Sequence, residues 1–455
     1  MSNFGSGISR RTFLGISTGL STSLLFAEQV PANVPQTMHF GIASVDITGK
    51  PGPELAGFLA RVQPSTGIHR PLFARAAFLE QGSERLFWLI ADSLGYTPEL
   101  VARVKKHIAE KYDLEPWRIL VQATHTHSAP SASRLSSCGE YNENYVETIL
   151  LPGFFRAADA AKANAEPCQM VEATGQCAIS IDRRNKPTKH TETRVPAIGW
   201  KRPDGSFKAV MLGYTMHSSS YVNGDISPDW PGATADAIRE LFSQETEPFV
   251  FQGACGNINY PKKNFPYEEL AECGRIIART VADLLKKGAP STPSLAVRAQ
   301  PIDVQLDYLD LKGIEEFAGR MRSSLAGNAK GLQAVAIWED WAKNYIDHNG
   351  PRSIKTDIAV ALIGNRAFVT SPFETLSWMN LELAKHTNVE CFAMGYTNGC
   401  YNYLSHDAAY DEGGYEPDTS RLWYCNFRMK RGELERLAEN SAPLVEAATK
   451  AAGLK

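Results

Sequence analysis

The stretch FWLIADSLGYTPELVARVKKHIAEKYDLEPWRILVQA, residues 87–123, decides the fold class. Residues 87–91 form a short apolar run of the kind that makes a buried strand, and residues 118–123 form a second one. The segment between them, from Pro98 to Tyr112, has the periodicity of an amphipathic helix. A strand, a helix and another strand in this order favour a parallel pair of strands joined by a crossover helix.

The remainder of the chain continues this alternation of short apolar runs and amphipathic segments. We expect strands at 209–214, 249–252, 358–363, 367–370 and 391–394, and helices at 145–165, 231–241, 267–287, 311–325, 332–348, 376–386 and 431–452. No Pro- or Ser-rich linker and no internal repeat interrupts the pattern. We therefore predict one large α/β domain, with mixed or parallel sheets flanked by helices and the active site at the carboxyl ends of the strands.

Composition excludes several classes of protein. Of the 455 residues, 43% are hydrophobic, which is ordinary for a globular chain that buries a core. A net charge of -3 without runs of like charge argues against nucleic acid as a partner. We expect a small-molecule or lipid-like substrate. None of the eight cysteines forms a CxxC pair, which argues against a thiolate zinc site. The oligomeric state is not determined by the sequence.

The N-terminus is typical of an export signal. Ser9-Arg10-Arg11-Thr12-Phe13-Leu14 is a twin-arginine motif, and the apolar run that follows is far shorter than the ~20 residues of a spanning helix. We predict a signal peptide over residues 1–32 and a mature chain over residues 33–455, without a transmembrane helix. The protein is then periplasmic or secreted. A buried N-terminal helix with two chance arginines is the alternative.

Thr124-His125-Thr126-His127 follows the second strand of the opening segment directly. Because side chains alternate along a strand, both histidines point to one face if the strand continues. Two imidazoles in that arrangement can share a metal ion, or one can bind it while the other moves protons. A hydrogen-bonded pair of histidines without a metal fits the spacing equally well.

Further polar residues follow other predicted strands. His217 ends one strand, and a turn containing Asp229 comes next. Asn259 lies in a glycine-containing turn after the next strand. Glu374 follows a later strand, where it could simply be an acid in the first turn of a helix. The segment from Tyr396 to Pro417 is rich in Tyr, Asp and Gly, and we interpret it as the wall of a pocket.

These segments, in this order, resemble the N-terminal catalytic domain of the neutral/alkaline non-lysosomal ceramidase family. The closest matches are residues 67–76, the Thr-His-Thr-His-Ser-Ala-Pro motif at 124–130, and residues 217–232. The resemblance covers almost the whole chain after the predicted signal, and the histidine motif is its most specific part.

The resemblance implies one Zn²⁺ per chain, held by two histidines, a glutamate and a tyrosine. Residue by residue, these ligands are His125, His217, Glu374 and Tyr403. Nitrogen and oxygen ligands in a tetrahedral set suit zinc.

The resemblance also implies which residues act on the substrate. His127 matches a histidine near the metal that contacts the substrate carbonyl, and Arg183 matches an arginine near the site. With Tyr403, these residues are expected to stabilise negative charge that develops during the reaction. A solvated arginine with acidic neighbours is the alternative for Arg183. The predicted substrate-binding residues are Asp229, Asn259 and Tyr415.

Two features depart from the family. Its enzymes present a serine, considered important in amide cleavage, in a turn that here contains Asn259. Ser227 lies in a Gly-Asp-Ile-Ser-Pro turn whose residues match the family's turn, but this turn follows the preceding strand and not the one that the family uses. Only 52 residues follow Tyr403 and the last of them are predicted to be helical, so we expect no C-terminal immunoglobulin-like domain.

The sequence thus predicts an exported, zinc-dependent hydrolase that cleaves an amide (N-acyl) bond with metal-activated water. The resemblance implies a role in sphingolipid metabolism. One alternative is a zinc hydrolase of a soluble carbohydrate-derived or acylated substrate. Another is a non-catalytic exported binding protein in which the metal is structural.

Overall fold

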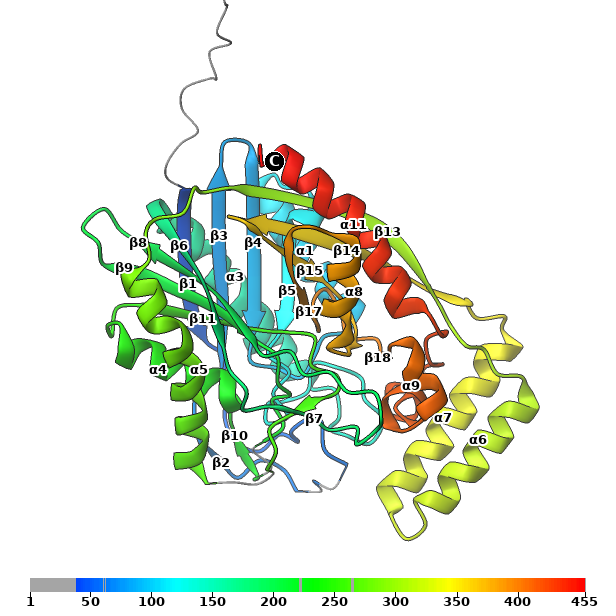
Figure 1. Cartoon of the computed structure of the whole chain (residues 1–455). Coiled ribbons are helices and arrows are strands. Elements are labelled where there is room, and N and C mark those ends of the chain that lie inside the picture. The colour runs from blue at the N-terminus through cyan, green and yellow to red at the C-terminus, as the bar shows by residue number, and fades with distance from the viewer. Residues whose placement is uncertain (1–37, 60, 62, 221–222, 263–265, 455) are drawn as a thin grey trace, which may run out of the picture. The chain divides into compact units, whose positions relative to one another are not determined.

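The opening segment folds as predicted. Strand β4 (Glu84–Ala91) leads through helix α1 (Pro98–Tyr112) to β5 (Ile119–Ala123), and the two strands pair in parallel. The side chain of Thr97 caps α1 by accepting a hydrogen bond from the N–H of Leu100, and Pro98 occupies the first turn. The computed structural model describes residues 38–59, 61, 63–220, 223–262 and 266–454 (Figure 1).

The larger sheet has eight strands in the order β11-β9-β8-β6-β1-β3-β4-β5. Its end pairs β4–β5 and β11–β9 are parallel and the strands between are antiparallel, so the sheet is mixed. The other strands are β1 (Met38–Asp46), β3 (Phe73–Gln81), β6 (Glu166–Gln176), β8 (Arg194–Lys201), β9 (Phe207–Tyr214) and β11 (Glu247–Gln252).

A second sheet has four strands in the order β13-β14-β15-β17. The pair β15–β17 is parallel and the other two pairs are antiparallel. Its strands are β13 (Leu295–Gln305), β14 (Ser353–Ile363), β15 (Arg366–Thr370) and β17 (Glu390–Met394).

The two sheets pack face to face between layers of helices (Figure 1). One apolar cluster contains Trp88 and Phe249 from the larger sheet and Phe368 from the smaller. The outer face of the larger sheet packs on α1, α3 (Leu151–Ala163), α4 (Asp229–Leu241) and α5 (Tyr267–Lys287). The outer face of the smaller sheet packs on α8 (Trp378–His386) and α11 (Glu433–Ala451). Helices α6 (Leu311–Ser324) and α7 (Ala329–Asp347) pack on each other at the side of this layer.

Short two-stranded pairs hold the loops at one end of the sheets. They are β2 (Gly67–Ile68) with β10 (Asp225–Ile226), β12 (Ile258–Asn259) with β7 (Ile181–Asp182), and β16 (Glu374–Thr375) with β18 (Tyr403–Leu404). Short helices α9 (Asp407–Glu412) and α10 (Arg421–Tyr424) follow β18. The register of β16 with β18 places Glu374 opposite Tyr403.

The predicted α/β class with mixed sheets is confirmed, and two local predictions need correction. The helix predicted at 145–165 is divided: α2 (Glu143–Tyr145) and a π-helical turn (Val146–Leu150) precede α3, next to Pro152, which lacks an N–H for the α-helical ladder. The helix predicted from residue 376 begins at Trp378, so Glu374 lies in β16 and not in a first helical turn.

The remaining sequence-based expectations concern the signal peptide, membrane-spanning helices and the cysteines. The predicted signal peptide, residues 1–32, lies outside the described residues. Within the described part, no helix is both long and apolar enough to cross a bilayer. All eight cysteines lie in that part, and none is in a disulfide.

Candidate active site

The loops that carry three of the predicted metal ligands follow the carboxyl ends of strands that have a parallel neighbour. His125 follows β5, His217 follows β9, and Glu374 follows β15. The end of β17 leads into Tyr396, whose carbonyl accepts a hydrogen bond from the N–H of Ala123 at 3.1 Å. Loops from both sheets therefore meet at one place, as expected for an α/β fold.

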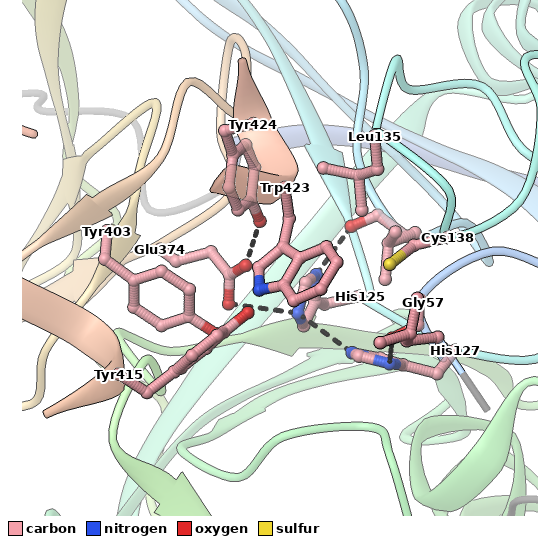
Figure 2. A pocket seen from close by; sticks show the side chains of 12 residues that line it. Gly57, His125, His127, Leu135, Cys138, Glu374, Tyr403, Tyr415, Trp423 and Tyr424 are labelled. Atoms are coloured by element: carbon pink, nitrogen blue, oxygen red, sulfur yellow. Dashed lines mark hydrogen bonds and ion pairs between the residues drawn. The ribbon is translucent and has the colours of Figure 1, made fainter. Parts of the chain in front are cut away.

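The strand does not continue through the histidine motif. Strand β5 ends at Ala123, and His125 has a φ of 60°, in the left-handed region that residues other than glycine rarely adopt. The condition under which an extended strand would align the two histidines is therefore not met. They meet nonetheless, because the turn brings Nε2 of His125 to 3.3 Å from Nε2 of His127 (Figure 2).

Three histidines converge with their Nε2 atoms. His217 Nε2 is 3.1 Å from His125 Nε2. Each Nδ1 is bonded to a backbone carbonyl instead: His125 to Leu94 at 2.6 Å, His127 to Gly57 at 3.1 Å, and His217 to Cys255 at 2.9 Å. A carbonyl only accepts, so each Nδ1 carries the proton and each Nε2 presents a lone pair in the neutral ring.

Glu374 adds a carboxylate to this group. Its Oε2 lies 3.2 Å from Nε2 of His125 and 3.4 Å from Nε2 of His217. The hydroxyl of Tyr424 donates to its other oxygen (Figure 2). Tyr396 stacks on His125 with ring centroids 3.9 Å apart, and its hydroxyl donates to Oε2 at 3.2 Å.

Burial sets the protonation states of the group. It lowers the pKa of His217 to about 4, with nearby Arg183 acting in the same direction. It also holds the pKa of His127 well below the usual range. Burial alone would raise the pKa of Glu374, but His125 and His217 outweigh it and keep that pKa well below its ordinary value. At neutral pH His127 and His217 are therefore neutral, and Glu374 is ionised.

This arrangement fits a metal ion. Three imidazole Nε2 atoms and a carboxylate oxygen converge on one point, and nitrogen and oxygen atoms of these kinds are the ligands that zinc takes. His125, His127 and His217 are close enough to share one ion, their ligand atoms lying within 4.8 Å of one another. The backbone carbonyls on Nδ1 fix the tautomers as outer partners of metal-bound histidines do.

Arg183 links this group to the tyrosine loop. Its Nη2 donates to the Tyr403 hydroxyl at 2.9 Å, and its Nη1 lies 3.5 Å from Nε2 of His217. Its Nε donates to Glu416 at 2.8 Å, so the guanidinium is held by a buried carboxylate and is not a solvated surface group. Nη1 also donates to Oδ1 of Asn259 at 3.3 Å.

The predicted substrate-binding residues lie in different places. Tyr415 lines the cavity at the histidines. Asn259 lines a neighbouring cavity with Arg183. Asp229 is fully buried and lines neither cavity; its carboxylate accepts from the N–H groups of Ser220 and Trp230. Ser227 is buried too, with its hydroxyl 3.2 Å from Nδ1 of His69.

The cavity over the histidines has a volume of about 240 Å³. Tyr403 and Tyr415 come from the segment between Tyr396 and Pro417, which therefore forms a pocket wall as predicted, and Trp423 follows that segment in α10. Sequence reasoning missed Tyr424 and Trp423 as individual residues, although their place soon after that segment was a usable signal. It also missed the leucines of the opposite wall, which carry no sequence signal for a site: Leu59, Leu94 and Leu135.

Comparisons with known proteins concern the family and the fold of the chain. Residues 38–185 match the family model described as neutral/alkaline non-lysosomal ceramidase, N-terminal. The crystal structure of neutral ceramidase from Pseudomonas aeruginosa superposes with a TM-score of 0.71 at 16% identity, covering 92% of this chain and 75% of that one. A ceramidase complexed with C2 superposes with a TM-score of 0.72, again at 16% identity, covering 92% of this chain and 76% of that one.

At 16% identity these superpositions show a shared fold. The resemblance to the neutral/alkaline non-lysosomal ceramidase family is therefore confirmed, with the family's N-terminal model matched over residues 38–185 and the ceramidase fold extending over most of the chain.

Proposed function

We propose that the chain is a zinc-dependent hydrolase that cleaves an amide (N-acyl) bond. The observation that carries the proposal is the convergence of the Nε2 atoms of His125 and His217 on the carboxylate of Glu374. The family match and the ceramidase fold support a ceramidase-like hydrolase, and with it a role in sphingolipid metabolism.

We assign one ion per chain to His125, His217, Glu374 and Tyr403. The first three have atoms within 3.4 Å of one another, and Tyr403 lies opposite Glu374 in the β16–β18 pair. His127 is the competing fourth ligand, because its Nε2 also points into the group. A bound zinc ion supplies Lewis acidity, which activates water and polarises a carbonyl group at neutral pH.

The chain's own residues do the remaining work. Arg183 is positively charged at any physiological pH and is held by Glu416, so it can stabilise negative charge on a substrate oxygen without moving. Each such donor is worth roughly 3 kcal/mol in hydrolases. His127 is neutral at pH 7, so its Nε2 can accept a proton from an attacking water.

Water is the proposed nucleophile because no serine occupies the position that the family uses. Asn259 has no nucleophilic group, and its side-chain oxygen is bonded to Arg183. Ser227 is outside the cavity.

Metal content tests the proposal directly. We expect about one zinc per chain in purified protein, and its loss together with N-acyl hydrolysis in His125→Ala. His107→Ala, an exposed histidine on α1, is the control and should keep both. Tyr403→Phe and His127→Gln separate the two candidates for the fourth ligand, since only loss of a true ligand weakens zinc affinity. A metal-free protein with full activity would rule the proposal out.

We also propose export through the twin-arginine pathway. Its support is the Ser9-Arg10-Arg11 motif and the short apolar run after it. Replacing both arginines with lysine should leave the protein in the cytoplasm; unchanged export of that variant would contradict the assignment.

A further inference from the structure

A second cavity adjoins the first. It has a volume of about 500 Å³ and is lined by Asn259, Tyr260 and the segment from Gly413 to Glu416. Tyr415 lines both cavities, so it forms the partition between them. Tyr415 follows Gly413 and Gly414, whose φ angles of 62° and 116° are conformations that other residues rarely adopt. Tyr415 itself is 40% exposed.

The wall of this second cavity is positively charged. Arg183, Arg184 and Lys186 all line it, against the single carboxylate of Glu416. Glu412, just behind, is paired with Arg184 at 3.2 Å. Three positive charges therefore stand against two negative ones.

Lys186 carries the uncompensated charge. Its Nζ donates to the backbone carbonyl of Glu412 at 2.6 Å, which is a neutral acceptor. Among the ion pairs of the described residues none involves Lys186, whereas Arg183 pairs with Glu416 and Arg184 with both glutamates. An ammonium group fixed by a carbonyl at the edge of a cavity suits an anionic group of a ligand.

Arg183 connects this charged wall to the reacting centre. The same guanidinium reaches Tyr403 and lies 3.5 Å from His217. A substrate whose scissile bond lies at the histidines can thus extend past Tyr415 into the charged cavity. The first cavity, with its leucines and Trp423, has the apolar wall that an acyl chain needs.

We propose that the substrate is an N-acyl amino acid, with its acyl chain in the first cavity and its carboxylate in the second, near Lys186. This inference rests on the proposed hydrolase function and names its substrate class, an N-acyl amino acid in place of the sphingolipid that the family match supports. Water adds to the amide carbonyl, the C–N bond breaks, and the nitrogen takes a proton. The products are a fatty carboxylate and a free amino acid.

The test uses a pair of substrates that differ only in charge: N-hexanoylglutamate and its diamide. With the zinc-loaded full chain, we expect kcat/KM for the acid to exceed that for the diamide about tenfold, as for a hydrogen bond between charged groups. Lys186→Ala should abolish this preference. Lys186→Arg should retain it, and so should Lys106→Ala, which removes an exposed lysine of α1. Added salt should weaken it.

Binding is measured separately, by calorimetric titration of the zinc-free full chain with the same two compounds. A preference for the acid that depends on Lys186 is expected here too. Equal affinity and equal kcat/KM for the two compounds, or a preference that survives Lys186→Ala, would overturn the inference. Selective binding of the acid without hydrolysis of either compound would support the charged subsite and overturn the proposed function instead.

Discussion

His127 owes its position to a glycine. Gly57 has a φ of 99°, and its carbonyl accepts the hydrogen bond from Nδ1 of His127. A Cβ on Gly57 would come within 2.3 Å of that Nδ1. We expect Gly57→Ala to push the ring away and to reduce N-acyl hydrolysis at least tenfold, because a proton-transfer group contributes 10²–10⁴-fold when it is well placed, an order-of-magnitude range.

Gly52→Ala is the matched control for this change. Gly52 also has a positive φ, 124°, but a Cβ there would meet nothing within 4 Å. Both variants should lose about 1–2 kcal/mol of unfolding free energy from backbone strain. Only Gly57→Ala should lose activity, in steady-state kinetics normalised to folded protein; equal losses in both would show that His127 is not the cause.

His406 makes stability depend on pH. It is buried, stacks on Trp378 with centroids 4.5 Å apart, and neither ring nitrogen has a hydrogen-bond partner in the structure. Burial, with Arg184 acting in the same direction, lowers its pKa from 6.5 to about 4. Between pH 6.5 and pH 4, His406 is therefore protonated in the unfolded chain but not in the folded chain. The free energy of unfolding falls as the pH drops through this range.

A pKa shift of this size would lower the free energy of unfolding by about 3 kcal/mol at acidic pH, and screening by water reduces this loss to about 2 kcal/mol. His406→Phe keeps an aromatic ring on Trp378 and should remove this part of the pH dependence. Denaturant unfolding at pH 7 and pH 4.5 measures it. An identical pH dependence in the variant would show that other groups are responsible.

At the scale of elements, one glutamine ties two site loops together. Gln252, at the end of β11, donates through Nε2 to the carbonyl of Thr124 at 3.1 Å and to that of Met216 at 2.9 Å. These are the residues directly before His125 and His217. Each carbonyl also accepts a second hydrogen bond, from the Ser218 hydroxyl at 2.7 Å and from Nε1 of Trp230 at 2.9 Å. Gln252→Leu should therefore cost about 1–2 kcal/mol for the lost hydrogen bonds, and should also weaken zinc binding because the two loops lose their common anchor.

Gln81 provides a comparison for this effect. It also bridges two backbone groups, Pro293 O and Leu295 N–H, each at 2.8 Å, but at the opposite end of the sheets. Gln81→Leu should lower thermal stability while zinc affinity, measured by competition with a chelator, stays unchanged. If Gln252→Leu likewise left zinc affinity unchanged, Gln252 would be structural only.

At the scale of the whole molecule, the two sheets share one core. The ring of Trp88 in β4 lies 5.4 Å from Phe249 in the same sheet and 5.4 Å from Phe368 in the other. Trp88→Ala should therefore reduce the unfolding free energy by about 3–5 kcal/mol and destabilise both sheets together. Hydrogen exchange should accelerate in β9 and β15 alike, whereas Ile337→Ala, at an exposed position of α7, should change neither. Unaffected exchange in β15 would show that the sheets unfold independently.

The sequence by itself determined the elements whose apolar pattern is strong, and the residues that a specific motif marks. Helices α1 and α5 begin and end where the periodicity predicts, because proline starts and amphipathic faces are local properties. The antiparallel strands β1, β6 and β13 were not predicted, since their pairing depends on partners far along the chain. Only the tertiary structure brought the Nε2 atoms of His125 and His217 and Oε2 of Glu374 within 3.4 Å of one another. This depends on a left-handed backbone conformation at His125 that no sequence pattern predicts. The tertiary structure also set apart Asp229, whose polar turn resembled a binding site but whose carboxylate is bonded to backbone N–H groups. Local sequence fixes which atoms are available, whereas long-range packing decides which of them meet.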